Sequence, residues 1–111
     1  MSDVMKEAMD PGAPSPVAEG IVGEALREVE GLLPPGIVLG TDPEAPLAAP
    51  EGPLDSLGIV NLVAAAEEAA AHHGSGPLGL MEALSLPLEE SPFRTVGTLQ
   101  AWVEAALAGK G

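Results

Sequence analysis

A proline-rich stretch at residues 31–55 most constrains what this chain can fold into. Its sequence, GLLPPGIVLGTDPEAPLAAPEGPLD, carries six prolines, so it cannot form one continuous helix. A loop of this length is uncommon inside a compact domain and is usually functional or disordered. Its apolar residues indicate that parts of it lie over the core; they are Ile37, Val38, Leu39, Leu47 and Leu54. Regular structure is therefore expected before and after this stretch.

The residues before the loop predict a helix from Pro16 to a stop at Gly31. Ser15 followed by Pro16 is a favourable pair for the N-cap and the first helical position. The charged residues lie largely outside an apolar stripe with a period near 3.6 residues. This stripe consists of Val17, Ile21, Val22, Leu26 and Val29.

Further helical segments are expected after the loop. A helix over about 56–71 is broken by Gly-Ser-Gly-Pro at 74–77. A short helix is expected within 78–86, followed by a turn or a single helical turn at 87–93. With no strand-like alternation, the class is all-α: a small bundle of three main helices and one or two short ones, with the long loop between the first two.

The last main helix is expected from Val96 to Leu107, with Thr95 as its N-cap. Its inward positions are Val96, Leu99, Val103 and Leu107. We therefore divide the chain into a flexible N-terminal tail, residues 1–15, and one helical domain, residues 16–108.

The charge balance narrows the possible partners. Seventeen acidic and four basic residues give a net charge of −13. Such a chain repels phosphate backbones and anionic lipids, which disfavours binding to nucleic acid or to a membrane surface. Two aromatic residues, Phe93 and Trp102, also make base stacking improbable. A protein partner with exposed Arg and Lys fits this charge best.

The chain contains no cysteine, which excludes a disulfide framework and a thiol nucleophile of its own. The first ten residues are charged and do not resemble a signal peptide, and no stretch of about 20 apolar residues is present. We therefore expect a cytoplasmic protein, monomeric in solution.

The predicted helix at 56–71 has two apolar faces. One would face the core and consists of Ile59, Leu62, Val63, Ala66 and Ala70. The other consists of Leu57, Val60 and Ala64 and continues into Glu67 and Glu68. Either the long loop covers this second face, or it is exposed and binds a partner's hydrophobic groove rimmed with Arg or Lys.

Three stretches resemble the acyl carrier proteins, in the same order along the chain. DSLGIVNLVAAAEEA, beginning at Asp55, is similar to the family's centre, where an Asp-Ser-Leu triplet opens the second helix. IVGEAL, beginning at Ile21, resembles the first-helix pattern, and FRTVGTLQAWVEAAL, beginning at Phe93, resembles the last. Together they span the predicted helical scaffold.

The resemblance implies that Ser56 accepts 4′-phosphopantetheine from coenzyme A, transferred by a phosphopantetheinyl transferase, and then carries acyl groups as thioesters. Asp55 would help present the serine. Acyl-loading and acyl-transferring enzymes with basic docking patches would contact Leu57, Val60, Ala64, Glu67 and Glu68. Ile59, Leu62 and Val63 would instead line the bundle interior, where members of the family can shelter a bound acyl chain. The protein would be a carrier and not an enzyme.

Some positions depart from the family's pattern. Pro53 stands where a Gly is usual, and Gly58 and Asn61 replace positions that are often acidic. The links before and after the second helix are also long. These departures favour a specialised pathway or a dedicated synthetase over housekeeping fatty acid synthesis. The resemblance itself implies biosynthesis of the fatty-acid or polyketide type.

Other interpretations stay open. An aminoacyl or peptidyl carrier is the nearest, although GPLDS lacks the Gly-Gly pair usual before its serine. Alternatively, Asp55 and Ser56 only cap the helix, and the chain is an unmodified adaptor that uses the Leu57 and Val60 face. However, no capping box forms, and Gly58 in the first turn costs up to about 1 kcal/mol relative to Ala. A stand-alone hydrolase lacks a recognisable set of catalytic residues.

Two histidines, His72 and His73, follow the second predicted helix. A metal site that included Glu67 or Glu68 is conceivable, but adjacent histidines point in different directions on a helix and no further ligand is evident. We therefore expect no metal. Trp102 is expected to pack on the last helix.

Overall fold

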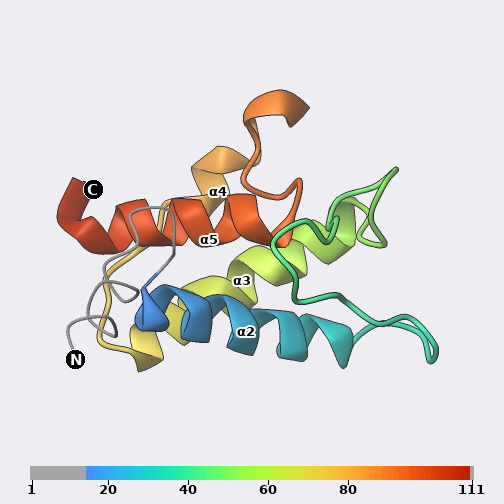
Figure 1. The fold of residues 1–111 in the computed structure, drawn as a ribbon, viewed down its shortest axis with the longest axis horizontal. Helices are drawn as coiled ribbons and strands as arrows, with labels where there is room; N and C mark the ends of the chain where they lie inside the picture. Colours follow the sequence, from blue (N-terminus) through green and yellow to red (C-terminus); the bar gives the residue numbers. More distant parts are fainter. Residues whose placement is uncertain (1–14, 111) are drawn as a thin grey trace, which may run out of the picture.

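The computed structural model describes residues 15–110, so the predicted tail 1–15 lies outside the described residues except for Ser15. The described part is helical and contains no strand, only two isolated β-bridges. The elements in chain order are α2 (Pro16–Glu30), α3 (Ser56–His72), α4 (Leu80–Ala83), the 3-10 helix η1 (Leu88–Glu90), α5 (Val96–Ala105) and a terminal π-helical turn η2 (Ala106–Lys110). The prediction of an all-α domain with three main helices is confirmed (Figure 1).

Helix α2 begins as the sequence predicts. Ser15 is its N-cap and accepts a hydrogen bond from the N–H of Ala18, and Pro16 occupies the first helical position. The buried stripe consists of Ala18, Ile21, Val22, Ala25, Leu26 and Val29. The prediction that Val17 belongs to this stripe is wrong, since Val17 is 43% exposed. At 100° per residue it lies about 110° from the centre of the stripe, and Ala18 occupies the inward position instead.

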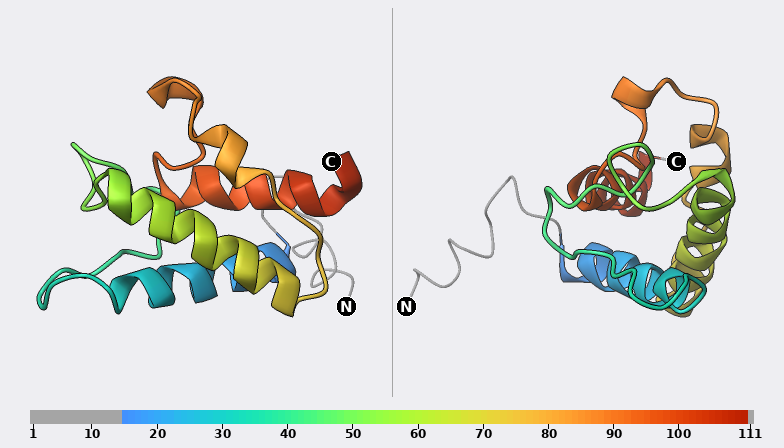
Figure 2. Two further views of the ribbon diagram at one scale, coloured as in Figure 1. Left: turned by 180° about the vertical axis from the view of Figure 1, so that it is seen from behind. Right: turned by 90° about the vertical axis from the view of Figure 1, so that its right-hand side faces the viewer.

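The three long helices surround one core. Helices α2 and α3 run in opposite directions along each other, and α2 also packs against α5 (Figures 1 and 2). The predicted inner face of α3 is confirmed: Ile59, Leu62, Val63, Ala66 and Ala70 are all buried. On α5, Val96, Leu99 and Val103 are buried as predicted, whereas Leu107 is partly buried.

The long loop lies over part of the core, as predicted, but not with all of its apolar residues. Leu39, Leu47 and Leu54 are buried, whereas Ile37 and Val38 are exposed. Backbone hydrogen bonds join residues 43–48 of the loop to residues 93–97 at the start of α5. The loop is therefore a strap that crosses the first turn of α5 and returns to the start of α3 (Figure 1).

The remaining boundaries agree closely with the sequence. Helix α3 ends one residue later than expected, at His72. Thr95 is the N-cap of α5 and forms a capping box with Thr98. The short helix within 78–86 and the single turn at 87–93 appear as α4 and η1. Across residues 15–110, none of the helices combines the length and the apolar character that crossing a bilayer requires.

Candidate functional site

Ser56 is the first residue of α3, and the cap of this helix is Asp55. The Asp55 carboxylate oxygen Oδ1 accepts a hydrogen bond from the N–H of Gly58, with 2.9 Å between the heavy atoms. Ser56 is exposed at the junction between the strap and the helix. The helix start therefore has a side-chain cap that does not require the serine hydroxyl.

Gly58 has a packing role that the sequence did not reveal. Gly58 is buried, and a β-carbon placed on it would lie 3.0 Å from Cδ2 and 3.2 Å from Cβ of Leu54. Leu54 is the buried residue through which the strap reaches α3. The first-turn glycine thus lets the loop pack closely against the helix. This contact accounts for a residue that helix propensity alone disfavours.

A cavity of about 400 Å³ opens beside Ser56. It lies between the first turns of α3, the strap, and the residues that follow α4 and precede α5. Its lining is mostly apolar and consists of Ala48, Ala49, Leu54, Asp55, Ser56, Ile59, Val60, Leu84, Ser91 and Phe93. The prediction that Ile59, Leu62 and Val63 lie in the bundle interior is confirmed, since all three are buried. Of the three, Ile59 also lines this cavity.

The second apolar face of α3 is exposed. Leu57 is 68% exposed and Val60 is 42% exposed, and Ala64 is exposed as well. The alternative that the long loop covers this face is therefore wrong. The strap contacts α3 where its Leu54 packs against Gly58 of the helix, on a different side of α3. Leu57, Val60 and Ala64 therefore form an exposed apolar strip along α3.

The two glutamates at the end of this face have different environments. Glu68 is exposed. Glu67 uses both carboxylate oxygens inside the protein: Oε1 accepts from the N–H of Leu78 at 2.9 Å, and Oε2 accepts from the N–H of Leu80 at 3.1 Å. The sequence carries no signal for this difference, because it depends on where the donor N–H groups of Leu78 and Leu80 pack against α3.

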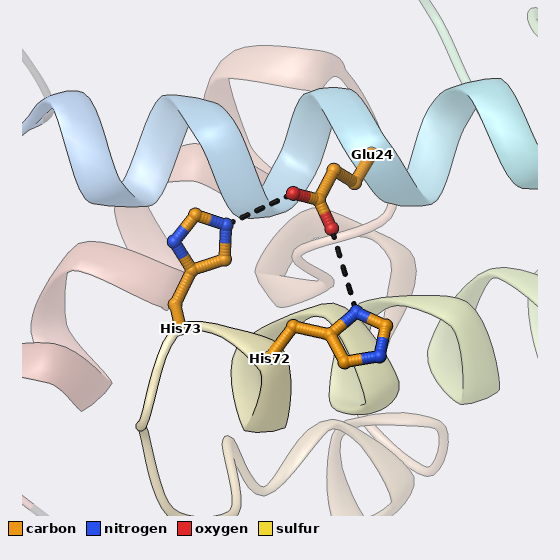
Figure 3. Close-up of polar contacts among 3 residues, drawn as sticks. All are labelled: Glu24, His72 and His73. Atoms are coloured by element: carbon orange, nitrogen blue, oxygen red, sulfur yellow. Dashed lines mark hydrogen bonds and ion pairs between the residues drawn. The ribbon is translucent and has the colours of Figure 1, made fainter.

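The two histidines meet Glu24 of α2 and not Glu67 or Glu68. His73 Nε2 lies 3.0 Å from Glu24 Oε2, and His72 Nδ1 lies 3.9 Å from Glu24 Oε1 (Figure 3). The His73 ring packs against Gly20, one turn before Glu24, where a β-carbon would lie at an ordinary contact distance of 3.5 Å from His73 Cε1. Across residues 15–110 no group of three or more His, Asp or Glu side chains is arranged to hold a metal ion.

Trp102 is a residue of α5, and its indole makes a specific hydrogen bond. The side chain is partly buried, and Nε1–H donates a hydrogen bond to the carbonyl oxygen of Leu78 at 2.8 Å. Leu78 is thus held from two sides, by Glu67 of α3 at its N–H and by Trp102 of α5 at its carbonyl.

Comparison of this chain with models of known protein families, with curated proteins and with solved structures finds no match.

Proposed function

We propose that this chain is an acyl carrier protein that holds acyl groups on a 4′-phosphopantetheine arm attached to Ser56. One observation carries the proposal: Ser56 is exposed at the start of a helix that Asp55 already caps, and it lies at the edge of a mostly apolar cavity of about 400 Å³. The three stretches that resemble acyl carriers, in order and on three helices, support the same interpretation.

The residues around Ser56 fit a phosphodiester-linked arm. In the modification, the serine oxygen forms a bond to the phosphorus of the phosphopantetheine. The pyrophosphate bond of coenzyme A breaks, adenosine 3′,5′-bisphosphate leaves, and the serine loses its proton. At the N-terminus of α3, the helix dipole and nearby backbone N–H groups favour a negative charge. The bound arm supplies a thiol, which the cysteine-free chain lacks, for acyl thioesters.

The cavity and the exposed face suit the two other tasks of a carrier. The apolar lining, with Phe93 and Leu54 buried behind it, can take part of an acyl chain out of water. Leu57, Val60 and Ala64 offer an apolar surface to partner enzymes, with Glu68 beside it for a partner's Arg or Lys. Glu67 contributes less to such docking, because both of its oxygens accept hydrogen bonds within the protein.

An unmodified adaptor is the second candidate, and the exposure of Leu57 and Val60 is the observation that favours it. In that case Ser56 has no function of its own, and the Leu57 and Val60 face alone binds the partner. An aminoacyl or peptidyl carrier would use the same serine but carry a different acid. The long strap and the long 73–79 link favour a carrier of a specialised pathway.

Intact-mass spectrometry tests the proposal. The protein is incubated with coenzyme A, Mg²⁺ and a promiscuous phosphopantetheinyl transferase. We expect a single gain of one phosphopantetheine, lost in Ser56→Ala and kept in Ser91→Ala, which removes the other serine hydroxyl that lines the cavity. No gain from folded, helical protein contradicts the carrier and leaves the adaptor. Loading the modified protein with fatty and amino acids then separates the two kinds of carrier.

A further inference from the structure

Helix α4 is a single turn without a side-chain cap of its own. It comprises only Leu80–Ala83, and its N-cap is Gly79, which has a positive φ of 77° and no side chain with which to accept a hydrogen bond. The first N–H groups of a helix need acceptors from elsewhere when they are buried. Leu80 is fully buried, so its N–H cannot donate a hydrogen bond to water.

Glu67 of α3 supplies the missing acceptor. Its two oxygens accept from the N–H groups of Leu78 and Leu80, the residues on either side of Gly79. A carboxylate is suited to this arrangement because both of its oxygens accept and neither donates. From α5, Trp102 holds the carbonyl of Leu78. The entry into α4 is thus fixed by one side chain from each of two main helices.

The position of α4 matters at the Ser56 cavity. Leu84, the C-cap of α4, lines this cavity together with Val60 and Ile59 of α3. Leu84 is itself 39% exposed, so its own burial holds it only weakly. Anything that fixes the start of a one-turn helix also fixes the residue at its end.

We propose that Glu67 is a positioning residue that fixes α4 against α3 and thereby sets the cavity wall formed by Leu84. The role of Leu84 as the wall of an acyl shelter depends on the proposed carrier function; the positioning of α4 by Glu67 does not. The neighbouring Glu68 has the same chemistry, is exposed, and provides a matched comparison one residue away.

Glu67→Gln is the variant that tests the positioning. A glutamine has one accepting oxygen and an NH₂ group that would face an N–H donor, so it cannot accept from both Leu78 and Leu80. Trp102 is the only tryptophan of the chain, so its fluorescence reports on the residues that pack against it. We expect a red-shifted emission in Glu67→Gln and an unchanged emission in Glu68→Gln.

Amide hydrogen exchange of the unmodified protein gives the second measurement. We expect exchange at Leu78 and Leu80 to be faster by roughly tenfold in Glu67→Gln and unchanged in Glu68→Gln, because the loss of a charge-assisted hydrogen bond lowers the free energy of local opening. If Glu67→Gln loses its helical circular dichroism as a whole, Glu67→Asp is used instead. It keeps the charge but is one methylene shorter, and the same direction is expected.

Equal exchange and equal emission in the Glu67 and Glu68 variants would overturn the proposal, since burial of Leu78, Leu80 and Ala83 would then hold α4 unaided. The link to the cavity is measured separately, on protein loaded with a medium-chain acyl thioester. Faster thioester hydrolysis in Glu67→Gln than in Glu68→Gln is expected. Altered exchange with unchanged hydrolysis overturns only the link to the cavity, and failure to load the protein at Ser56 contradicts the carrier function and not the positioning.

Discussion

The backbone N–H of Gly97 donates a hydrogen bond to the carbonyl oxygen of Pro43, with 2.8 Å between the two atoms. Next to it, the N–H of Val96 donates to the carbonyl of Ala45 at 3.0 Å. The strap thus supplies acceptors for the first turn of α5, whose N–H groups have no partner within the helix. This contact requires the backbone of Pro43 to approach the helix closely, and a residue without a side chain at position 97 permits it.

Gly97→Ala should therefore destabilise the fold although alanine is the better helix former. A β-carbon at Gly97 would lie 2.9 Å from the Pro43 oxygen and 3.1 Å from its Cβ, so the strap must move. We expect a loss of about 1–2 kcal/mol in the free energy of unfolding, the cost of overpacking reduced by the gain in propensity. Urea unfolding followed by circular dichroism measures it.

Gly76→Ala is the control for this variant, because a β-carbon there meets nothing within 4 Å. Its stability should equal or slightly exceed that of the natural chain. Equal stability of the two alanine variants would show that the contact between Pro43 and position 97 is not tight enough to exclude a β-carbon.

The sequence predicts the helices well because their signals are local. Stripes with helical period, Ser15 before Pro16 and Thr95 before Val96 place the three main helices within one or two residues of their observed ends. The strap could not be predicted in the same way. Its contacts with α5 are backbone hydrogen bonds between residues about 50 positions apart, and backbone groups leave no side-chain signal in the sequence.

Asp55 and Ser56 can be separated by their effects on stability. Asp55→Ala removes the acceptor for the Gly58 N–H and should cost about 1 kcal/mol, the usual value for an N-cap. Ser56→Ala removes an exposed hydroxyl and should change the free energy of unfolding by less than about 0.5 kcal/mol. The same urea titrations measure both. If Ser56→Ala lowered the free energy of unfolding as much as Asp55→Ala, the serine would also act as a helix cap.

The candidate site is only partly predictable from the sequence. The helical period predicts that Leu57 and Val60 lie on a face apart from the core, but the exposure of this face depends on the course of the strap. Two further features depend on how segments distant in the sequence pack against each other. They are the different environments of Glu67 and Glu68 and the contact between His73 and Glu24. The cavity beside Ser56 likewise requires the strap, α3 and the residues around α4 in place together.

Glu104 should make stability depend on pH. The N–H of Ser15 donates a hydrogen bond to its Oε1 at 2.9 Å, and this bond, with a smaller contribution from the Ser15 side chain, lowers the pKa of the carboxyl below its ordinary value of 4.5. A pKa that is lower in the folded state favours folding while the carboxylate is ionised. The stabilisation is therefore present above pH 4.5 and is lost as the pH falls through the folded pKa.

Thermal unfolding of Glu104→Gln between pH 3 and pH 7 measures this effect. The variant should have a lower Tm than the natural chain near neutral pH, and the difference should shrink as the solution becomes acidic. Glu28→Gln, at an exposed position of α2, controls for the change in net charge. A Tm difference that stays constant with pH, or that matches Glu28→Gln, would contradict the contribution of the contact between Ser15 and Glu104.

Leu84→Ala tests whether the cavity beside Ser56 shelters an acyl chain. Leu84 forms one wall of the cavity and is 39% exposed, so its truncation should widen the opening without unfolding the protein. On protein loaded at Ser56 with a medium-chain acyl group, less apolar contact leaves the thioester more accessible to water. Hydrolysis should therefore accelerate by about threefold to tenfold, since each lost methylene contact is worth up to about 0.8 kcal/mol.

Leu32→Ala, at a 64% exposed position outside the cavity, should leave hydrolysis unchanged. Equal rates in both variants would mean that the acyl chain lies elsewhere, and the cavity would then have to be explained by the packing of the strap alone.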